Sequence, residues 1–133
     1  MAFTVRFSGD NGDHGVAIGS HAVLKFDRIV SNIGNGYSTD TGRFTAPVSG
    51  VYAFSLVVMS TNAHGGADLA LVKGGVDLGH VWTEGATDIG DKGSTQVATH
   101  LDEGEQVWIQ EAVGDAVRGS YWTVFTGYLL QAE

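Results

Sequence analysis

The chain has 133 residues, of which 43% are hydrophobic and 17% charged, and its formal net charge is −8. This length fits one domain with a two-layer core, and we expect a single domain over residues 1–133. Seven lysines and arginines against fifteen acids provide no basic stripe, which argues against nucleic-acid binding. No apolar run is long enough to predict a membrane-spanning helix, and the first residues do not resemble a signal peptide.

Glycine is abundant, with 20 copies, whereas cysteine is absent. Closely spaced glycines oppose helices of normal length and favour short strands joined by tight turns. The lack of cysteine excludes disulfides, zinc–thiolate sites and thiol nucleophiles. The composition therefore predicts an all-β fold.

The first third of the chain alternates short strand patterns with loops. Residues 2–8 alternate apolar and polar side chains and predict a strand, and residues 9–15 form a polar, glycine-rich loop without the terminal glutamate of an EF-hand. Residues 21–30 predict one or two short strands around Phe26. Asn35-Gly36 is a two-residue turn signal.

The strongest strand pattern covers residues 51–59. Tyr52, Phe54, Leu56 and Val58 alternate with a second, mostly apolar set of residues. Because both sets are apolar, we expect a central strand that is buried on both faces.

The rest of the chain continues as strands and loops. Strand patterns occupy residues 68–73, 76–82, 94–101, 106–111 and 121–130, with a loop over 83–93. The total is about ten strands with no linker. This arrangement predicts a ten-stranded jelly-roll sandwich.

Motifs for catalysis are missing from the sequence. No Gly-x-Ser-x-Gly elbow is present, and the histidines show neither His-x-His nor His-Glu-x-x-His spacing. A catalytic pair of carboxylates, as in glycosidases, is not excluded by the sequence, because acidic residues are abundant. We predict that the protein is not an enzyme.

Aromatic residues at the ends of strands are candidate ligand-binding residues. Trp82 precedes an acidic loop, and Tyr121-Trp122 follows Arg118. Flat rings beside polar groups can hold sugars, and an arginine can bind a carboxylate or sulfate with two hydrogen bonds. The alternative is that these aromatic side chains fill the core or a subunit interface.

A metal candidate lies in the loop over residues 83–91. Glu84, Asp88 and Asp91 would supply the hard oxygen ligands that Ca²⁺ prefers. The alternative is a solvated acidic loop without a metal.

Seven residues with fixed spacing resemble the signature of the C1q globular-head domain. Leu56 stands where the family usually has Phe or Tyr, and the stretches 104–109 and 125–130 resemble two further strands of the family. The seven residues are Phe26, Asn32, Tyr37, Phe44, Gly50, Tyr52 and Phe54.

The resemblance implies a jelly-roll head of the C1q and tumour necrosis factor type, a homotrimer and an extracellular location. Some members of the family bind calcium in the corresponding loop. Asp91 matches one of their ligand positions, whereas Thr83-Glu84 stands where calcium binders have Asp-Gln. No collagen-like stalk precedes the domain in this sequence, as in small invertebrate C1q-domain proteins.

Three functions are consistent with this reading. The first is a lectin-like recognition protein that binds glycans or microbial surface molecules in innate immunity through a trimer. The second is a cytokine- or hormone-like ligand of a protein receptor. The third is an acidic, calcium-associated matrix protein.

Overall fold

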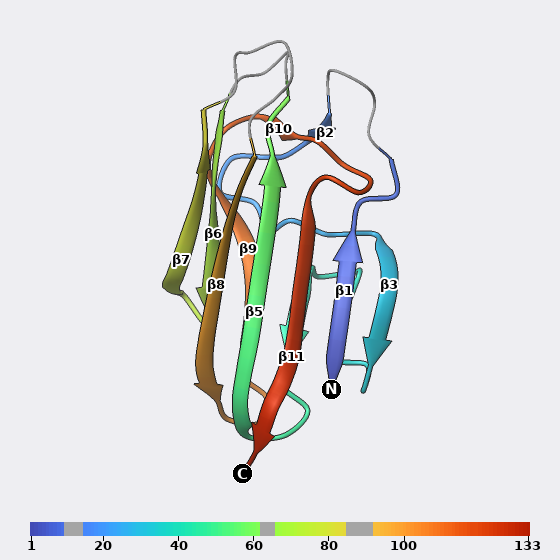
Figure 1. Cartoon of the computed structure of the whole chain (residues 1–133), viewed down its shortest axis with the longest axis vertical. Helices are drawn as coiled ribbons and strands as arrows, with labels where there is room; N and C mark the ends of the chain where they lie inside the picture. Colours follow the sequence, from blue (N-terminus) through green and yellow to red (C-terminus); the bar gives the residue numbers. More distant parts are fainter. Residues whose placement is uncertain (10–14, 62–65, 85–91) are drawn as a thin grey trace.

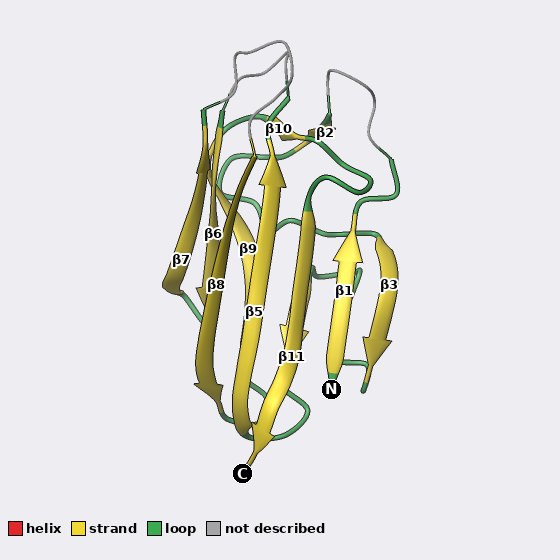
Figure 2. Cartoon of the chain, in the orientation of Figure 1, coloured by secondary structure: helices red, strands yellow, loops and turns green. Residues whose placement is uncertain are grey.

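The computed structural model describes residues 1–9, 15–61, 66–84 and 92–133, and within these ranges the chain is all-β (Figures 1 and 2). Its described part contains eleven strands, of which two have only two residues each. The strands are β1 (Ala2–Arg6), β2 (Val16–Ala17), β3 (Arg28–Ile33), β4 (Arg43–Thr45), β5 (Gly50–Met59), β6 (Ala67–Lys73), β7 (Val76–Thr83), β8 (Lys92–Leu101), β9 (Gln106–Val113), β10 (Ala116–Val117) and β11 (Val124–Ala132). Within the described ranges, no helix is long and apolar enough to cross a membrane.

Two antiparallel sheets form the layers of a sandwich, which confirms the predicted fold class. The first sheet has the strand order β3-β1-β11-β5-β8, and the second has the order β4-β9-β6-β7. The short strands β2 and β10 pair with each other near one end of the sandwich (Figure 2). β11 therefore lies beside β1 and β5, so the two ends of the chain meet in the first sheet.

Aromatic rings fill the space between the sheets. Phe3 is 1% exposed, and its ring centroid lies 4.9 Å from that of Phe44 and 4.9 Å from that of Phe125. Phe54 and Tyr52 from β5 complete this cluster. Since the cluster joins residues from both ends of the sequence, it fixes the pairing of distant strands.

Three of the signature residues are joined by hydrogen bonds that explain their spacing. The Asn32 side chain donates to the carbonyl of Tyr37 at 2.9 Å and accepts from its N–H at 3.1 Å, which closes the turn between them. The hydroxyl of the buried Tyr37 then donates to the carbonyl of Phe26 at 3.1 Å. The polar side chains of Asn32 and Tyr37 are therefore satisfied by bonds within the motif itself.

Residues 21–27 differ from the expected short strands. Only Val23 forms a bridge, to Gln110 of β9, and the next regular strand begins at Arg28. The segment instead binds β9 through individual hydrogen bonds, from the N–H of Leu24 to Ile109 and from the N–H of Glu111 to Ala22. The anchoring of Leu24, which is 2% exposed, accounts for this irregular path.

The expectation that β5 is buried on both faces is correct for one face only. Tyr52, Phe54, Leu56 and Val58 are at most 1% exposed, whereas the alternating set is partly exposed, up to 37% at Val51. The second sheet covers the inner face, and no second layer of this chain's described residues covers the outer one. The outer face of the first sheet is therefore available to another molecule.

Candidate ligand-binding face

Tyr121 and Trp122 lie in a tight turn just before β11. The N–H of Trp122 donates to the carbonyl of Gly119 at 3.1 Å, and this bond closes the turn. The two side chains are 71% and 40% exposed, respectively. They therefore fill neither the core nor a buried position in the single chain.

A positively charged side chain lies near each of these two rings. The Arg6 guanidinium carbon lies 4.2 Å from the ring centroid of Tyr121, and the Lys92 ammonium nitrogen lies 5.9 Å from that of Trp122. A cation at this distance is attracted to the negative face of the ring. We call Arg6, Lys92, Tyr121 and Trp122 the aromatic–cation face.

The first sheet brings these four residues together. Arg6 is the last residue of β1 and pairs with Val124 of β11, while Lys92 is the first residue of β8 and pairs with Met59 of β5. Because β11 and β5 lie between β1 and β8, the two cations flank the turn before β11. Sequence reasoning identified the aromatic residues but missed both cations, which lie far from them in the chain.

Arg118 connects this turn to the end of β5. Its backbone N–H donates to the carbonyl of Met59 at 2.8 Å, and its side chain is half-buried. Arg118 therefore holds the segment that leads into Tyr121 and Trp122. Its role as an anion-binding residue stays a prediction.

Trp82 lies on β7, in the second sheet, and is 59% exposed. The backbone of β7 nevertheless approaches β8 here, since a Cβ added to Gly93 would lie 3.3 Å from the carbonyl oxygen of Trp82. Gly93 directly follows Lys92. The neighbouring Val81 and Thr83 are buried between the sheets, so the exposed Trp82 ring lies on the outer side of the second sheet, and its binding role stays a prediction.

Of the three predicted calcium ligands, only Glu84 belongs to the described part of the chain, where it is exposed. Asp88 and Asp91 lie outside the described residues. Within residues 1–9, 15–61, 66–84 and 92–133, no group of three histidine or acidic side chains could hold a metal ion. The calcium prediction therefore stays a prediction.

Both ring nitrogens of His80 lie next to carboxylates. Its Nδ1 lies 2.9 Å from Asp68 Oδ1, and its Nε2 lies 2.9 Å from Asp77 Oδ2. The hydrogen bonds with Asp68 and Asp77 raise the pKa of His80 above its usual value. Because both ring nitrogens are occupied by carboxylates, the imidazole is not placed to act as a general base.

A family model described as "C1q domain" matches residues 2–130 of this chain. Over 118 residues the chain is 33% identical to human "Complement C1q and tumor necrosis factor-related protein 9B", covering 84% of this chain and 34% of that protein. It is 35% identical over 116 residues to mouse "Complement C1q and tumor necrosis factor-related protein 9", with 82% and 33% covered. The chain thus spans about a third of the length of these relatives.

Solved structures have the same fold at lower sequence identity. The globular domain of zebrafish complement 1qA protein matches with a TM-score of 0.81 and 22% identity, over 99% of this chain and 98% of that one. The structure of Eiger TNF from S. frugiperda matches with a TM-score of 0.74 and 14% identity, over 100% and 96% of the two chains. The expected jelly-roll architecture is confirmed by both likenesses.

Proposed function

This chain belongs to the C1q domain family, and from that premise we propose that it is a non-enzymatic, extracellular recognition protein. It acts as a homotrimer that binds glycans or microbial surface molecules in innate immunity. The observation that supports glycan binding is the aromatic–cation face, in which two exposed rings are flanked by Arg6 and Lys92.

The chemistry of this face fits a glycan that carries a carboxylate or sulfate group. The C–H groups of a sugar pack on the exposed surface of Tyr121, which stays 71% exposed although Arg6 covers part of its ring. Arg6 and Lys92 are the cations of this face that would pair with the acidic group, and Arg118, on the segment that leads into the turn, is a third candidate for that role.

The outer face of the first sheet supports assembly into a trimer. This face carries partly exposed apolar residues from β5 and β11, among them Val51, Tyr128 and Leu130. Another copy of the chain that covers this surface removes it from water. Three copies also convert weak binding of one sugar per domain into stronger binding to a surface that carries many sugars.

The loop over residues 83–91 is the proposed calcium site. Glu84, Asp88 and Asp91 are the residues that would hold the ion, which would add a cation close to Trp82. If this ion contributes to the binding of the glycan, removal of calcium weakens that binding.

A second candidate function is that of an extracellular ligand for a protein receptor. Relatives at 32–35% identity are named for a relation to both complement C1q and tumor necrosis factor. A receptor ligand needs no affinity for sugars and would instead offer a surface to a protein.

A glycan array distinguishes these functions. The array contains neutral, carboxylated and sulfated glycans, and the protein is applied in calcium and again in chelator after its mass has been checked by light scattering. Binding of a trimer to an acidic glycan class supports the lectin function, and loss of binding in chelator supports the calcium loop. A well-folded trimer that binds no glycan in either buffer contradicts it and favours the receptor ligand.

A further inference from the structure

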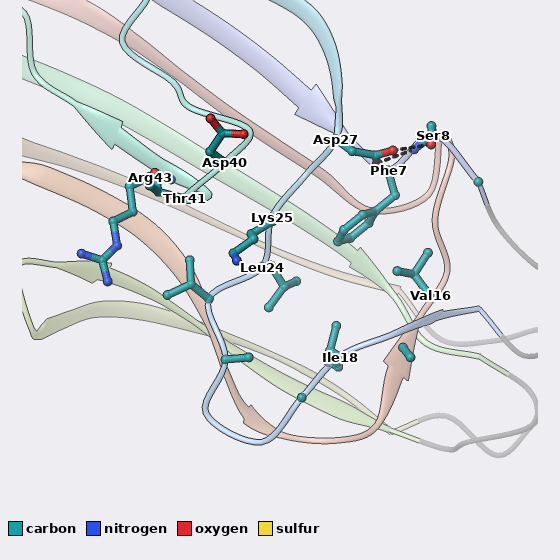
Figure 3. A pocket seen from close by; sticks show the side chains of 15 residues that line it. Phe7, Ser8, Val16, Ile18, Leu24, Lys25, Asp27, Asp40, Thr41 and Arg43 are labelled. Atoms are coloured by element: carbon teal, nitrogen blue, oxygen red, sulfur yellow. Dashed lines mark hydrogen bonds between the residues drawn. The ribbon is translucent and has the colours of Figure 1, made fainter.

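A cavity of about 900 Å³ is lined by none of the four residues of the aromatic–cation face. It is bounded by the end of β1, by the segment that contains β2 and runs on to β3, and by the loop before β4 (Figure 3). Its volume is in the range of pockets that bind small molecules, which usually measure about 300–1,000 Å³.

The inner part of the cavity is apolar. Phe7 and Leu24 are 7% and 2% exposed, and the partly buried Val16, Ile18 and Ala22 continue this lining. Figure 3 shows Phe7, Leu24, Val16 and Ile18 grouped at one side of the cavity. Such a lining accommodates the apolar body of a ligand.

The polar residues around the cavity are not balanced in charge. Asp27 is fixed at one edge, because its Oδ1 accepts from the N–H of Ser8 at 2.9 Å and its Oδ2 accepts from the Ser8 hydroxyl (Figure 3). Partial burial opposes its ionisation, but these hydrogen bonds outweigh that effect and hold the pKa of Asp27 below its usual value. Asp40 is a second, exposed carboxylate in the lining.

The cations of the lining do not cancel these acids. The guanidinium of Arg43 lies 4.4 Å from the ring centroid of Trp108 and donates to Gln106 at 3.4 Å, so it is directed to the second sheet. Lys25 is the other cation among the described lining residues, and it is exposed. The described lining therefore contains two carboxylates, Asp27 and Asp40, against one ammonium group, that of Lys25, on a chain whose net charge is −8.

We propose that this cavity binds a small cationic amphiphile, with an apolar body against Phe7 and Leu24 and a positively charged group beside Asp27 and Asp40. This site uses none of the residues of the aromatic–cation face. It gives the chain a second ligand class that is independent of the proposed recognition of sugars.

Titration calorimetry with three matched eight-carbon probes tests the proposal: n-octylammonium, octanoate and the neutral 1,2-octanediol, each below its micelle concentration. We expect saturable binding of n-octylammonium, about fivefold tighter than that of octanoate. Asp27→Asn and Asp40→Asn each weaken this binding about threefold. Asp102→Asn, an exposed acid that does not line the cavity, leaves it unchanged.

Filling the cavity is the second arm of the test. Ala22→Trp places a large side chain in the apolar part and abolishes binding of n-octylammonium, while glycan-array binding is retained. If Ala22→Trp does not fold, Ala17→Trp at an exposed lining position takes its place. Three results contradict the proposal: no saturable binding of n-octylammonium, binding of octanoate that is equal or tighter, or binding that survives in the tryptophan variant that folds.

Discussion

Gly127 of β11 lies where the core aromatic rings touch the backbone. A Cβ added at this position would be 2.5 Å from Phe3 Cε1 and 2.7 Å from Phe54 Cδ1. Both rings are 1% exposed and are packed against other rings, so they have little room to move. The absence of a side chain at Gly127 is therefore a packing requirement of the aromatic core.

We expect Gly127→Ala to lower the free energy of unfolding by about 1–3 kcal/mol, because the added methyl group overpacks the core. Gly9→Ala is the matched control, since a Cβ there has no atom within 4 Å. Urea denaturation of the two variants and the wild type measures the difference. Equal unfolding free energies for the two variants would show that the core tolerates the extra methyl group.

His80 links stability to pH through its two carboxylate partners. Its pKa is raised in the folded chain, so folding favours the imidazolium form. The stabilisation is fully present below the unfolded pKa of about 6.5 and is lost as the pH rises through the higher folded value. Because the His80 side chain is 42% exposed, solvent screens the interaction and keeps it small.

We expect His80→Gln to destabilise the protein by roughly 0.5 kcal/mol at pH 5.5 and by less at pH 8.5. Urea denaturation at the two pH values measures this difference, and the double variant Asp68→Asn/Asp77→Asn serves as the control because it removes both partners. In that background, His80→Gln has the same effect at both pH values. A larger destabilisation at pH 8.5 than at pH 5.5 would contradict the ion-pair account.

β5 and its neighbours present a shallow hollow on the outer face of the first sheet. The hollow measures about 160 Å³ and is lined by outward-facing residues of three strands, including Ala53 from β5, Ala98 from β8 and Tyr128 from β11. The small side chains of Ala53 and Ala98 leave room beside the ring of Tyr128, which is 46% exposed. A neighbouring copy that packs on this sheet would insert a side chain here.

Ala53→Arg tests this arrangement. The new side chain fills the hollow and adds a charge to the face, so we expect the homotrimer to dissociate to monomers. Light scattering after size-exclusion chromatography gives the mass, and circular dichroism checks the fold. Val76→Arg, at a 66% exposed position on β7, is the control and keeps the wild-type mass. A trimeric Ala53→Arg variant would place the interface elsewhere.

The features that could be predicted from the sequence are those formed by residues close together in the chain. The alternation of Tyr52, Phe54, Leu56 and Val58 located the central strand and its inner face. The spacing from Asn32 to Tyr37 carried the signature because the two residues bond to each other directly. The apolar residues of β5 alone could not predict that its outer face is partly exposed to solvent. That exposure depends on whether another part of the chain packs on the face.

The candidate site was predictable only in part. Tyr121 and Trp122 stand out as aromatic residues next to a strand, but their partners Arg6 and Lys92 come from β1 and β8. No local pattern connects residues that meet only through the strand order β1-β11-β5-β8. The cavity beside Asp27 was missed for the same reason, since it is formed by three segments that are separate in the sequence.

At the scale of the whole molecule, the chain combines an acidic overall charge with two cations, Arg6 and Lys92, that lie against exposed aromatic rings. The formal charge of −8 disfavours nonspecific binding to anionic surfaces. The proposed binding to an acidic glycan therefore depends on the local pairing of Arg6 and Lys92 with the exposed rings. In the proposed trimer, three such faces would bind a glycan-covered surface together, which would raise the overall affinity.

The most direct test of this account compares the wild type, Trp122→Ala and the control Val76→Ala on the same glycan array, each checked for folding and mass. The account predicts that the wild type and Val76→Ala bind one class of acidic glycan. Trp122→Ala, still trimeric, binds it about tenfold more weakly. Glycan binding that is unchanged in Trp122→Ala, or a wild-type trimer that binds no glycan, would contradict the account.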